Sequence, residues 1–84
     1  GSRFTVKALT PVEDFNEFFA ARLDDERADT VGGIVISELG RLPKRGESVD
    51  LGRYRFRVVR ADNRRVHLLE LQLLDEHQHA QSAV

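Results

Sequence analysis

Arginine alternates with apolar residues in the middle of the chain, and this alternation restricts the possible folds more than any other feature. Residues 53–58 read Arg-Tyr-Arg-Phe-Arg-Val, with the cations at Arg53, Arg55 and Arg57. Successive side chains of a β-strand point to opposite faces of a sheet, so the pattern predicts one apolar face and one charged face. The chain therefore has to cover one face of a sheet and leave the other in water.

Further strands are predicted on both sides of this one in the sequence. Gly52 reverses the chain before it, and Asp62-Asn63 forms a turn after it. Between Leu68 and Leu69 the apolar residues change parity, so either both faces of the last strand are covered or a β-bulge shifts its register there, and we favour the bulge. The predicted partner strands are residues 4–8, 48–51 and 66–74.

Two amphipathic helices are predicted between the first and second strands. The first has Thr10 as its N-cap, and Glu13 completes a capping box. The second starts at Asp29 or Thr30 and ends at Gly40, and Pro43 prevents its continuation. The apolar residues that follow helical spacing in the first helix are Val12, Phe15, Phe18, Phe19 and Leu23.

These elements predict an α+β fold in the order β-α-α-β-β-β. The fold is a two-layer sandwich in which two helices cover one face of an antiparallel sheet. A chain of 84 residues suits one domain. We interpret residues 1–3 as a cloning remnant and linker, residues 4–75 as the domain, and residues 76–84 as a flexible tail.

The glycine pair Gly32-Gly33 at the start of the second helix has two interpretations. A glycine-rich helix start can hold a phosphate, but a Walker loop or a dinucleotide fingerprint would need residues that are missing here. Glycine is also unfavourable in a helix by about 1 kcal/mol relative to alanine, which indicates a neighbour that touches the backbone. We favour close packing, against the first helix with Phe15, Phe18 and Phe19.

No catalytic or metal-binding arrangement stands out, so an enzyme is not predicted. The absence of cysteine excludes disulfides and thiolate ligands, and the serines show no triad-like pattern with a histidine. The acidic loop could hold a divalent cation through carboxylates, but we favour a solvated loop without a metal. His67 shows no sign of being a ligand, and His77 and His79 lie in the tail. The acidic loop consists of Asp24, Asp25, Glu26 and Asp29.

The net charge of −1 hides a strong segregation of charge. Residues 11–30 hold seven acidic and two basic residues, whereas residues 41–67 hold nine basic and three acidic ones. The basic sheet face is interpreted first as solvated and second as a docking surface for an acidic protein. Nucleic acid is not expected, because the aromatic residues point to the opposite face. The candidate interaction surface comprises Arg53, Arg55, Arg57, Arg60, Arg64 and Arg65.

The stretch 30–71 resembles the transporter-associated domain of the CorC/HlyC family, and the resemblance extends from residue 4 to residue 75. The pattern combines a threonine-started helix, a Gly-Arg-hydrophobic-Pro turn, a Gly-Glu hairpin entry and an aromatic strand. The first helix, which is acidic and contains asparagine, also matches. Position 32 is glycine where small residues such as alanine are usual. The matching residues are Thr30, Gly33, Gly40, Arg41, Pro43, Gly46, Glu47, Phe56 and Val58.

The resemblance implies a cytosolic domain that follows a transmembrane domain and a CBS-domain pair in proteins linked to magnesium and cobalt efflux, some of them labelled haemolysins. Such a domain is expected at the cytoplasmic face of the membrane without inserting into it. There it would modulate ion transport through contacts with the other domains of its parent, which could also make it a homodimer. The fold is expected to be similar to the FAD-binding subdomain of flavin oxidases. No cofactor is expected, and the alternative is a module that binds flavin adenine dinucleotide or an adenine nucleotide.

Overall fold

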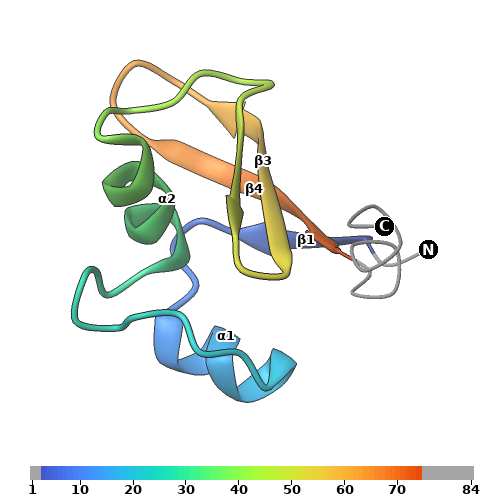
Figure 1. Ribbon diagram of the computed structural model, residues 1–84. Coiled ribbons are helices and arrows are strands. Elements are labelled where there is room, and N and C mark those ends of the chain that lie inside the picture. The colour runs from blue at the N-terminus through green and yellow to red at the C-terminus, as the bar shows by residue number, and fades with distance from the viewer. Residues whose placement is uncertain (1–2, 75–84) are drawn as a thin grey trace, which may run out of the picture.

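A computed structural model describes residues 3–74 of the chain. All strand pairs are antiparallel, and the sheet order is β1-β4-β3-β2. The predicted α+β fold and its element order are confirmed, and β1 begins one residue before the predicted domain start. The predicted tail lies outside the described residues. The elements are β1 (Arg3–Lys7), α1 (Val12–Phe19), α2 (Val31–Leu39), β2 (Ser48–Leu51), β3 (Tyr54–Ala61) and β4 (Val66–Leu73) (Figure 1).

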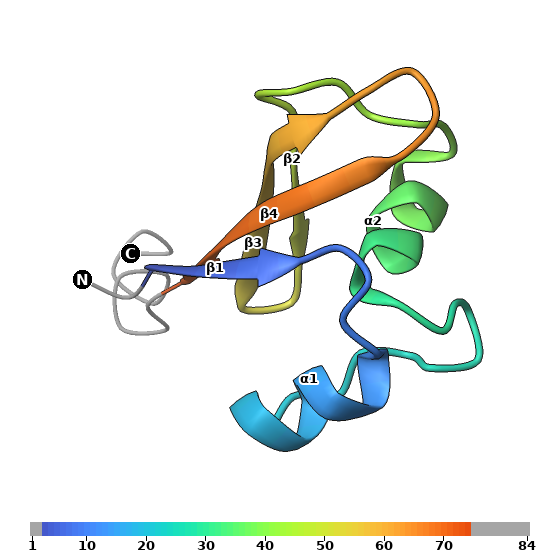
Figure 2. The ribbon, with the colours of Figure 1, turned by 180° about the vertical axis from the view of Figure 1, so that it is seen from behind.

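Both helices lie on the same side of the sheet (Figures 1 and 2). On β3 the side chains of Tyr54, Phe56 and Val58 are buried, while the residues between them are exposed. From α1, the ring of Phe15 contacts those of Tyr54 and Phe56 at centroid distances of 5.7 and 5.6 Å. From α2, Val35 belongs to the same core cluster. The face opposite the helices is called the outer face below.

The start of α1 differs from the prediction. Pro11 is the N-cap and makes no side-chain cap hydrogen bond, so the predicted Thr10 cap and the capping box with Glu13 are wrong. Instead, the Val12 N–H donates to the carbonyl of Asp29, 2.9 Å away. A backbone acceptor that is distant in sequence thus replaces the local side-chain cap.

The end of α1 also corrects the prediction. The helix stops at Phe19, because Ala20 takes a left-handed conformation with φ of 52°. The side chain of Asn16 then bonds both the N–H and the carbonyl of Leu23, at 2.9 Å each, which holds Leu23 outside the helix. Phe18 was predicted to be buried but is 78% exposed. At 3.6 residues per turn it lies beside the stripe that buries Phe15, not within it.

The close packing predicted for Gly32-Gly33 is confirmed, but the predicted neighbour is wrong. A Cβ atom on Gly32 would lie 2.7 Å from the Cβ of Ala8, which follows β1. A Cβ atom on Gly33 would lie 2.8 Å from the Cβ of Ala28, in the α1–α2 connection. The residues that approach the glycine pair therefore belong to these two segments and not to the aromatic stripe of α1.

The predicted register shift near Leu68 and Leu69 is confirmed in the pairing of β3 with β4, but its extra residue, Val59, lies in β3 and not in the last strand. Leu69 pairs with Val58, whereas Leu68 pairs with Arg60, so the register shifts between these two pairs. It shifts again before Ala61. Since Leu68 also pairs with the exposed Lys7 of β1, the shift places Arg60 on the outer face.

Candidate interaction surface

The outer face of the sheet is polar and crossed by rows of charged side chains. The register aligns Arg55 of β3 with Asp50 of β2 and with Gln72 of β4, and Gln72 pairs in turn with Arg3 of β1. The next row aligns Arg57 with residues of the same strands, and a third contains Lys7 and Arg60. Together the rows contain five cations and two carboxylates. The second row consists of Thr5, Glu70, Arg57 and Ser48.

A groove of about 280 Å³ runs between the first two rows. Arg3, Arg55 and Arg57 provide its positive charge, and the Glu70 carboxylate is the one acid in its lining. The groove therefore has an excess of positive charge and can accept an acidic side chain or a carboxylate-rich segment.

The cations in this groove differ in how they are held. The Arg55 guanidinium binds Asp50 in a bidentate manner, with Nε–Oδ1 at 2.7 Å and Nη2–Oδ2 at 3.1 Å. This contact holds the pKa of Asp50 below its ordinary value and raises the pKa of Arg55. The side chain of Arg57 is exposed and forms no hydrogen bond or ion pair within residues 3–74. Its charge is thus available to a partner.

The structure does not bring all six predicted arginines together. Arg60 shares the outer face with Arg55 and Arg57, as described above. Arg64 and Arg65 lie in the β3–β4 turn, where their backbone N–H groups donate to Oδ1 of Asp62 at 2.7 and 2.8 Å. Arg53 precedes β3 at the opposite end of that strand. The predicted surface is therefore a central group of three arginines, with the other three at the two ends of β3.

Some residues of the outer face were not identified from the sequence. Arg3 had been assigned to the linker, and the parity change in β4 concealed the outward positions of Glu70 and Gln72. In β2 the exposed Ser48 and Asp50 alternate with the half-buried Val49 and Leu51. The sequence shows the same alternation of polar and apolar residues, which could have identified Ser48 and Asp50 as outward-facing.

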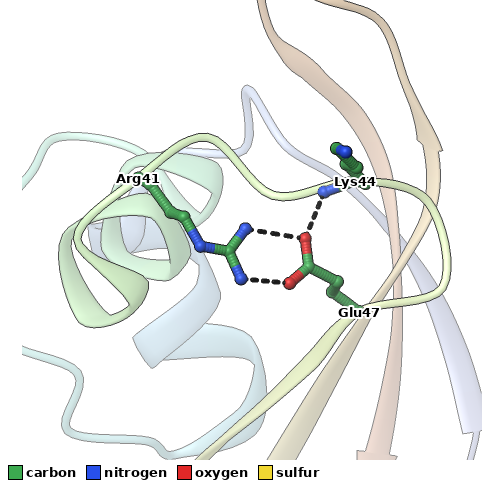
Figure 3. A network of polar contacts seen from close by, with 3 residues as sticks. All are labelled: Arg41, Lys44 and Glu47. Carbon is green, nitrogen blue, oxygen red and sulfur yellow. Dashed lines mark hydrogen bonds and ion pairs between the residues drawn. The ribbon is translucent and has the colours of Figure 1, made fainter.

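The turn between α2 and β2 is held by a network around one carboxylate (Figure 3). Arg41 binds Glu47 through both Nη atoms of its guanidinium group, with Nη1–Oε2 at 2.9 Å. The Lys44 N–H donates to Oε2 at 2.6 Å. The Arg41 side chain and the Lys44 N–H lower the pKa of Glu47 from 4.5 to about 2. The side chain of Glu47 thus closes the turn together with the backbone hydrogen bond from the Glu47 N–H to the Lys44 carbonyl at 3.1 Å.

The other motif residues of this region also have structural roles. Gly40 caps α2 with φ of 77°, and Gly46 has φ of 95°, conformations that favour glycine. Pro43 is fully buried. The Gly46 N–H donates to the carbonyl of Val58 at 2.8 Å, which fastens the turn to β3. These contacts position β2, which is an edge strand of the sheet and therefore one edge of the outer face.

At the start of α2, the N–H groups of both glycines already donate hydrogen bonds within the domain and are not free to bind a phosphate. The Gly32 N–H donates to the carbonyl of Ala8 at 2.9 Å. The Gly33 N–H donates to Oγ1 of Thr30 at 3.2 Å, which makes Thr30 the N-cap. Since both donors are already used within the domain, the phosphate interpretation of the glycine pair is not supported.

A second cavity, of about 430 Å³, lies between the α1–α2 connection and the β2–β3 turn. Leu23, Ile34 and Tyr54 contribute apolar lining, and Arg22 and Arg27 contribute charge. The Arg27 guanidinium is bound by Glu38 at 3.1 Å and by Ser37. Among the described residues no polar side chain is buried, so no converging set of polar groups marks this cavity as a ligand site.

Within residues 3–74 no group of three or more His, Cys, Asp or Glu side chains is placed to hold a metal ion. In the acidic loop, Oδ1 of Asp24 accepts the Glu26 N–H at 2.9 Å. His67 contacts Oδ2 of Asp62 through Nε2 at 2.8 Å, and His77 and His79 lie outside the described residues. Across the same residues, neither helix has the length and apolar character needed to span a membrane.

Comparison with known proteins gives a consistent result. The family model CorC_HlyC, described as a transporter-associated domain, matches residues 1–75. The chain is 51% identical over 72 residues to the magnesium and cobalt efflux protein CorC of Vibrio cholerae, and 44% identical over 73 residues to that of Escherichia coli K12. These matches cover 86% and 87% of this chain but 25% of each relative. The chain thus spans a quarter of the length of these curated relatives.

Solved structures show the same fold. A transporter (CorC) associated region from Neisseria meningitidis MC58 is 49% identical, with a TM-score of 0.85 over 88% of this chain and 91% of that one. A CorC_HlyC domain of a Xylella fastidiosa Temecula1 hemolysin, solved in complex with Mg²⁺ and Mn²⁺, is 32% identical, with a TM-score of 0.77 over 87% and 89%. The sequence and structural similarity both extend over nearly all of the described chain.

Proposed function

The chain belongs to the CorC_HlyC family of transporter-associated domains, and we propose that it is a non-catalytic accessory domain that modulates ion transport by docking on another part of its parent protein. In this proposal the parent is a membrane-bound magnesium and cobalt efflux protein of the CorC type. The domain lies at the cytoplasmic face of the membrane, and its partners are the CBS-domain pair and the transmembrane domain. No cofactor is required for this role.

The outer face is the observation that supports docking. It places Arg55, Arg57 and Arg60 on rigid strands, where their positions are set by the sheet register. A basic surface of this kind attracts an acidic partner and orients it. Added salt screens this attraction and therefore weakens the complex. Arg57 and Arg60 contribute most to the argument, because neither side chain forms an ion pair within residues 3–74.

Charge reversal of the unpaired cations tests the proposal. In Arg57→Glu/Arg60→Glu the Arg55–Asp50 pair is kept, so the sheet retains its internal contacts. A matched control, Arg22→Glu/Arg45→Glu, changes the net charge equally at exposed positions that do not line the groove. Association of the domain with the remaining cytosolic part of the parent, and ion efflux by the intact protein, are measured for both variants.

We expect the outer-face variant to weaken association by about tenfold or more, because a partner would then face like charges, and to alter efflux. The control should remain within about twofold of the wild type. Equal weakening in both variants would mean that only net charge matters. Unchanged association and efflux in the outer-face variant would leave these arginines as a solvated surface and contradict the proposal.

A further inference from the structure

Helix α1 presents an aromatic patch to solvent on the helical side of the domain. The patch consists of Phe4, Phe18 and Phe19. Phe18 is 78% exposed and Phe4 is 40% exposed. Phe19 lies in ring contact with both, at centroid distances of 4.8 Å from Phe18 and 5.2 Å from Phe4. An exposed group of large aromatic side chains on a small domain is typical of a contact surface.

The patch is anchored to the core and is not a loose collection of side chains. The ring of Phe19 lies 4.7 Å from that of Phe15, which is 2% exposed and packs on the sheet. Phe4 belongs to β1 and is held by its pairing with Leu71. Because the rings are supported in this way, a partner that covers them loses little side-chain freedom on the domain side.

Carboxylates lie on the same helix as Phe18 and Phe19. Asp14 precedes Phe18 by one helical turn, and Glu17 is its neighbour in sequence. Glu13 extends the acidic side, and no basic residue occurs in the last turn of the helix. All three carboxylates are exposed, and within residues 3–74 they make no hydrogen bond or ion pair. Their charge therefore remains uncompensated.

We propose that α1 binds a polypeptide segment in which apolar side chains are flanked by lysine or arginine, such as a basic amphipathic helix. The apolar side chains would cover Phe18 and Phe4, and the basic ones would pair with Asp14 and Glu17. This binding site has the opposite charge to the outer face and lies on the other layer of the sandwich. It is therefore independent of the function proposed above.

Other occupants fit the charge less well. Two copies of α1 packed on each other would bring identical carboxylates together, and an anionic membrane or a nucleic acid would be repelled. The sequence after the described residues starts with two acids and contains no lysine or arginine. A basic and apolar protein segment is the occupant that satisfies both the rings and the carboxylates.

The test uses the 84-residue chain and two synthetic helical peptides of equal length, one of leucine and lysine and one of leucine and glutamate. Binding is followed by anisotropy of the labelled peptide and by amide chemical shifts of the domain. We expect the leucine–lysine peptide to bind, with the largest shifts at Phe4, Phe18 and Phe19, and the leucine–glutamate peptide not to bind. Added salt should weaken the complex.

Two pairs of variants separate the site from general stickiness. Phe18→Ser should weaken binding by about tenfold, whereas Leu9→Ser, at an apolar residue that is 70% exposed, should change it by less than about twofold. Asp14→Lys/Glu17→Lys should also weaken binding. Its control, Asp25→Lys/Glu26→Lys, reverses the same amount of charge at two exposed positions of the acidic loop and should not. The variant Arg57→Glu/Arg60→Glu should bind as the wild type does.

Several results would overturn the proposal. These are equal binding of both peptides, an unchanged affinity of Phe18→Ser, shifts that cluster away from α1, or no binding of the leucine–lysine peptide at millimolar concentration. A dimer in sedimentation that Phe18→Ser abolishes would identify a second copy as the occupant. Binding to vesicles of anionic lipid that requires Phe18 would identify a membrane. Either of these last two results replaces the proposed partner.

Discussion

The outer face of the sheet and the exposed side of α1 differ in the sign of their charge and in their content of aromatic residues. On the outer face, arginines stand on β1 and β3, which both pair with β4, with no large aromatic residue between them. On α1, aromatic rings and acids stand on a helix of eight residues that is attached to the sheet chiefly through Phe15. The outer face can bind a charged partner through side chains whose spacing is set by the sheet. The exposed side of α1 combines apolar contact with charge on a short helix. Two surfaces of opposite sign allow one small domain to contact two different partners.

The largest expected effect comes from removing the link between the two layers. Phe15→Ala deletes a ring that is 2% exposed and contacts both Tyr54 and Phe56. Such a truncation costs about 3–5 kcal/mol of unfolding free energy, because transfer and cavity terms add. Urea unfolding measures the loss, and hydrogen exchange locates it. Amides of α1 should lose protection before those of β3 and β4, and equal loss everywhere would mean that the two surfaces are not separable.

The second effect concerns the joint between β1 and α2. In Gly32→Ala the new Cβ would meet the Cβ and the carbonyl oxygen of Ala8, at 2.7 and 3.0 Å. Overpacking of this kind costs about 1–3 kcal/mol, more than the helix propensity that alanine adds. Gly33→Ala is the comparison, since its closest contacts are side-chain atoms of Ala28 and Thr30. Urea melts should rank Gly32→Ala as the less stable variant, and the reverse order would show that the Ala28 contact is the tighter constraint.

The features predicted correctly from sequence depend on local chemistry. The alternation in β3 identified its inner and outer side chains, because strand geometry alone determines them. Likewise, Gly40 was identified as the end of α2, and Thr30 was one of the two N-caps predicted for its start, since a hydroxyl N-cap and a left-handed glycine act within a few residues.

The features that were missed depend on contacts between distant residues. The carbonyl of Asp29 replaces the Thr10 cap, and the bonds from Asn16 to Leu23 accompany an early end of α1. That early end leaves Phe18 outside the core. Sequence periodicity cannot show such contacts, because it assumes that the helix continues. For the same reason the acidic and aromatic surface of α1 was recognised only in the structure.

A third prediction concerns the pH dependence of stability. It tests how much the Glu47 contacts in the α2–β2 turn, next to the edge of the outer face, stabilise the fold. The pKa of Glu47 is lowered from 4.5 to about 2 by Arg41 and the Lys44 N–H. A carboxyl whose pKa is lower in the folded state stabilises the fold above its unfolded pKa and loses this effect as the pH falls through the folded pKa. The stabilisation from Glu47 should therefore disappear between about pH 4.5 and about pH 2.

Glu47→Gln isolates this contribution. The variant should be less stable than the wild type near neutral pH, and the difference between their urea midpoints should shrink on acidification through this range. Asp50 and Asp62 titrate in both proteins and cancel in the difference. A difference that is constant with pH would mean that the Arg41–Glu47 contact contributes through its shape and not through its charge.

The smallest expected effects on stability are those of the two surfaces themselves. Phe18→Ser and Arg57→Gln replace side chains that are exposed and that support no buried neighbour, so each should change unfolding free energy by about 0.5 kcal/mol or less. Thermal melts of the two variants and the wild type should nearly coincide. A large loss in Phe18→Ser would show that its ring supports the fold and would remove the contrast between the two surfaces.

Mapping of the contact with the parent protein tests the central claim most directly. The isotope-labelled domain is titrated with the remaining cytosolic part of its parent, and its amide signals are followed residue by residue. The account predicts that signals of Arg55, Arg57 and Arg60 shift or broaden, and that Arg57→Glu/Arg60→Glu removes the effect. Shifts confined to the cavity between the α1–α2 connection and the β2–β3 turn, with the outer face unchanged, would contradict it.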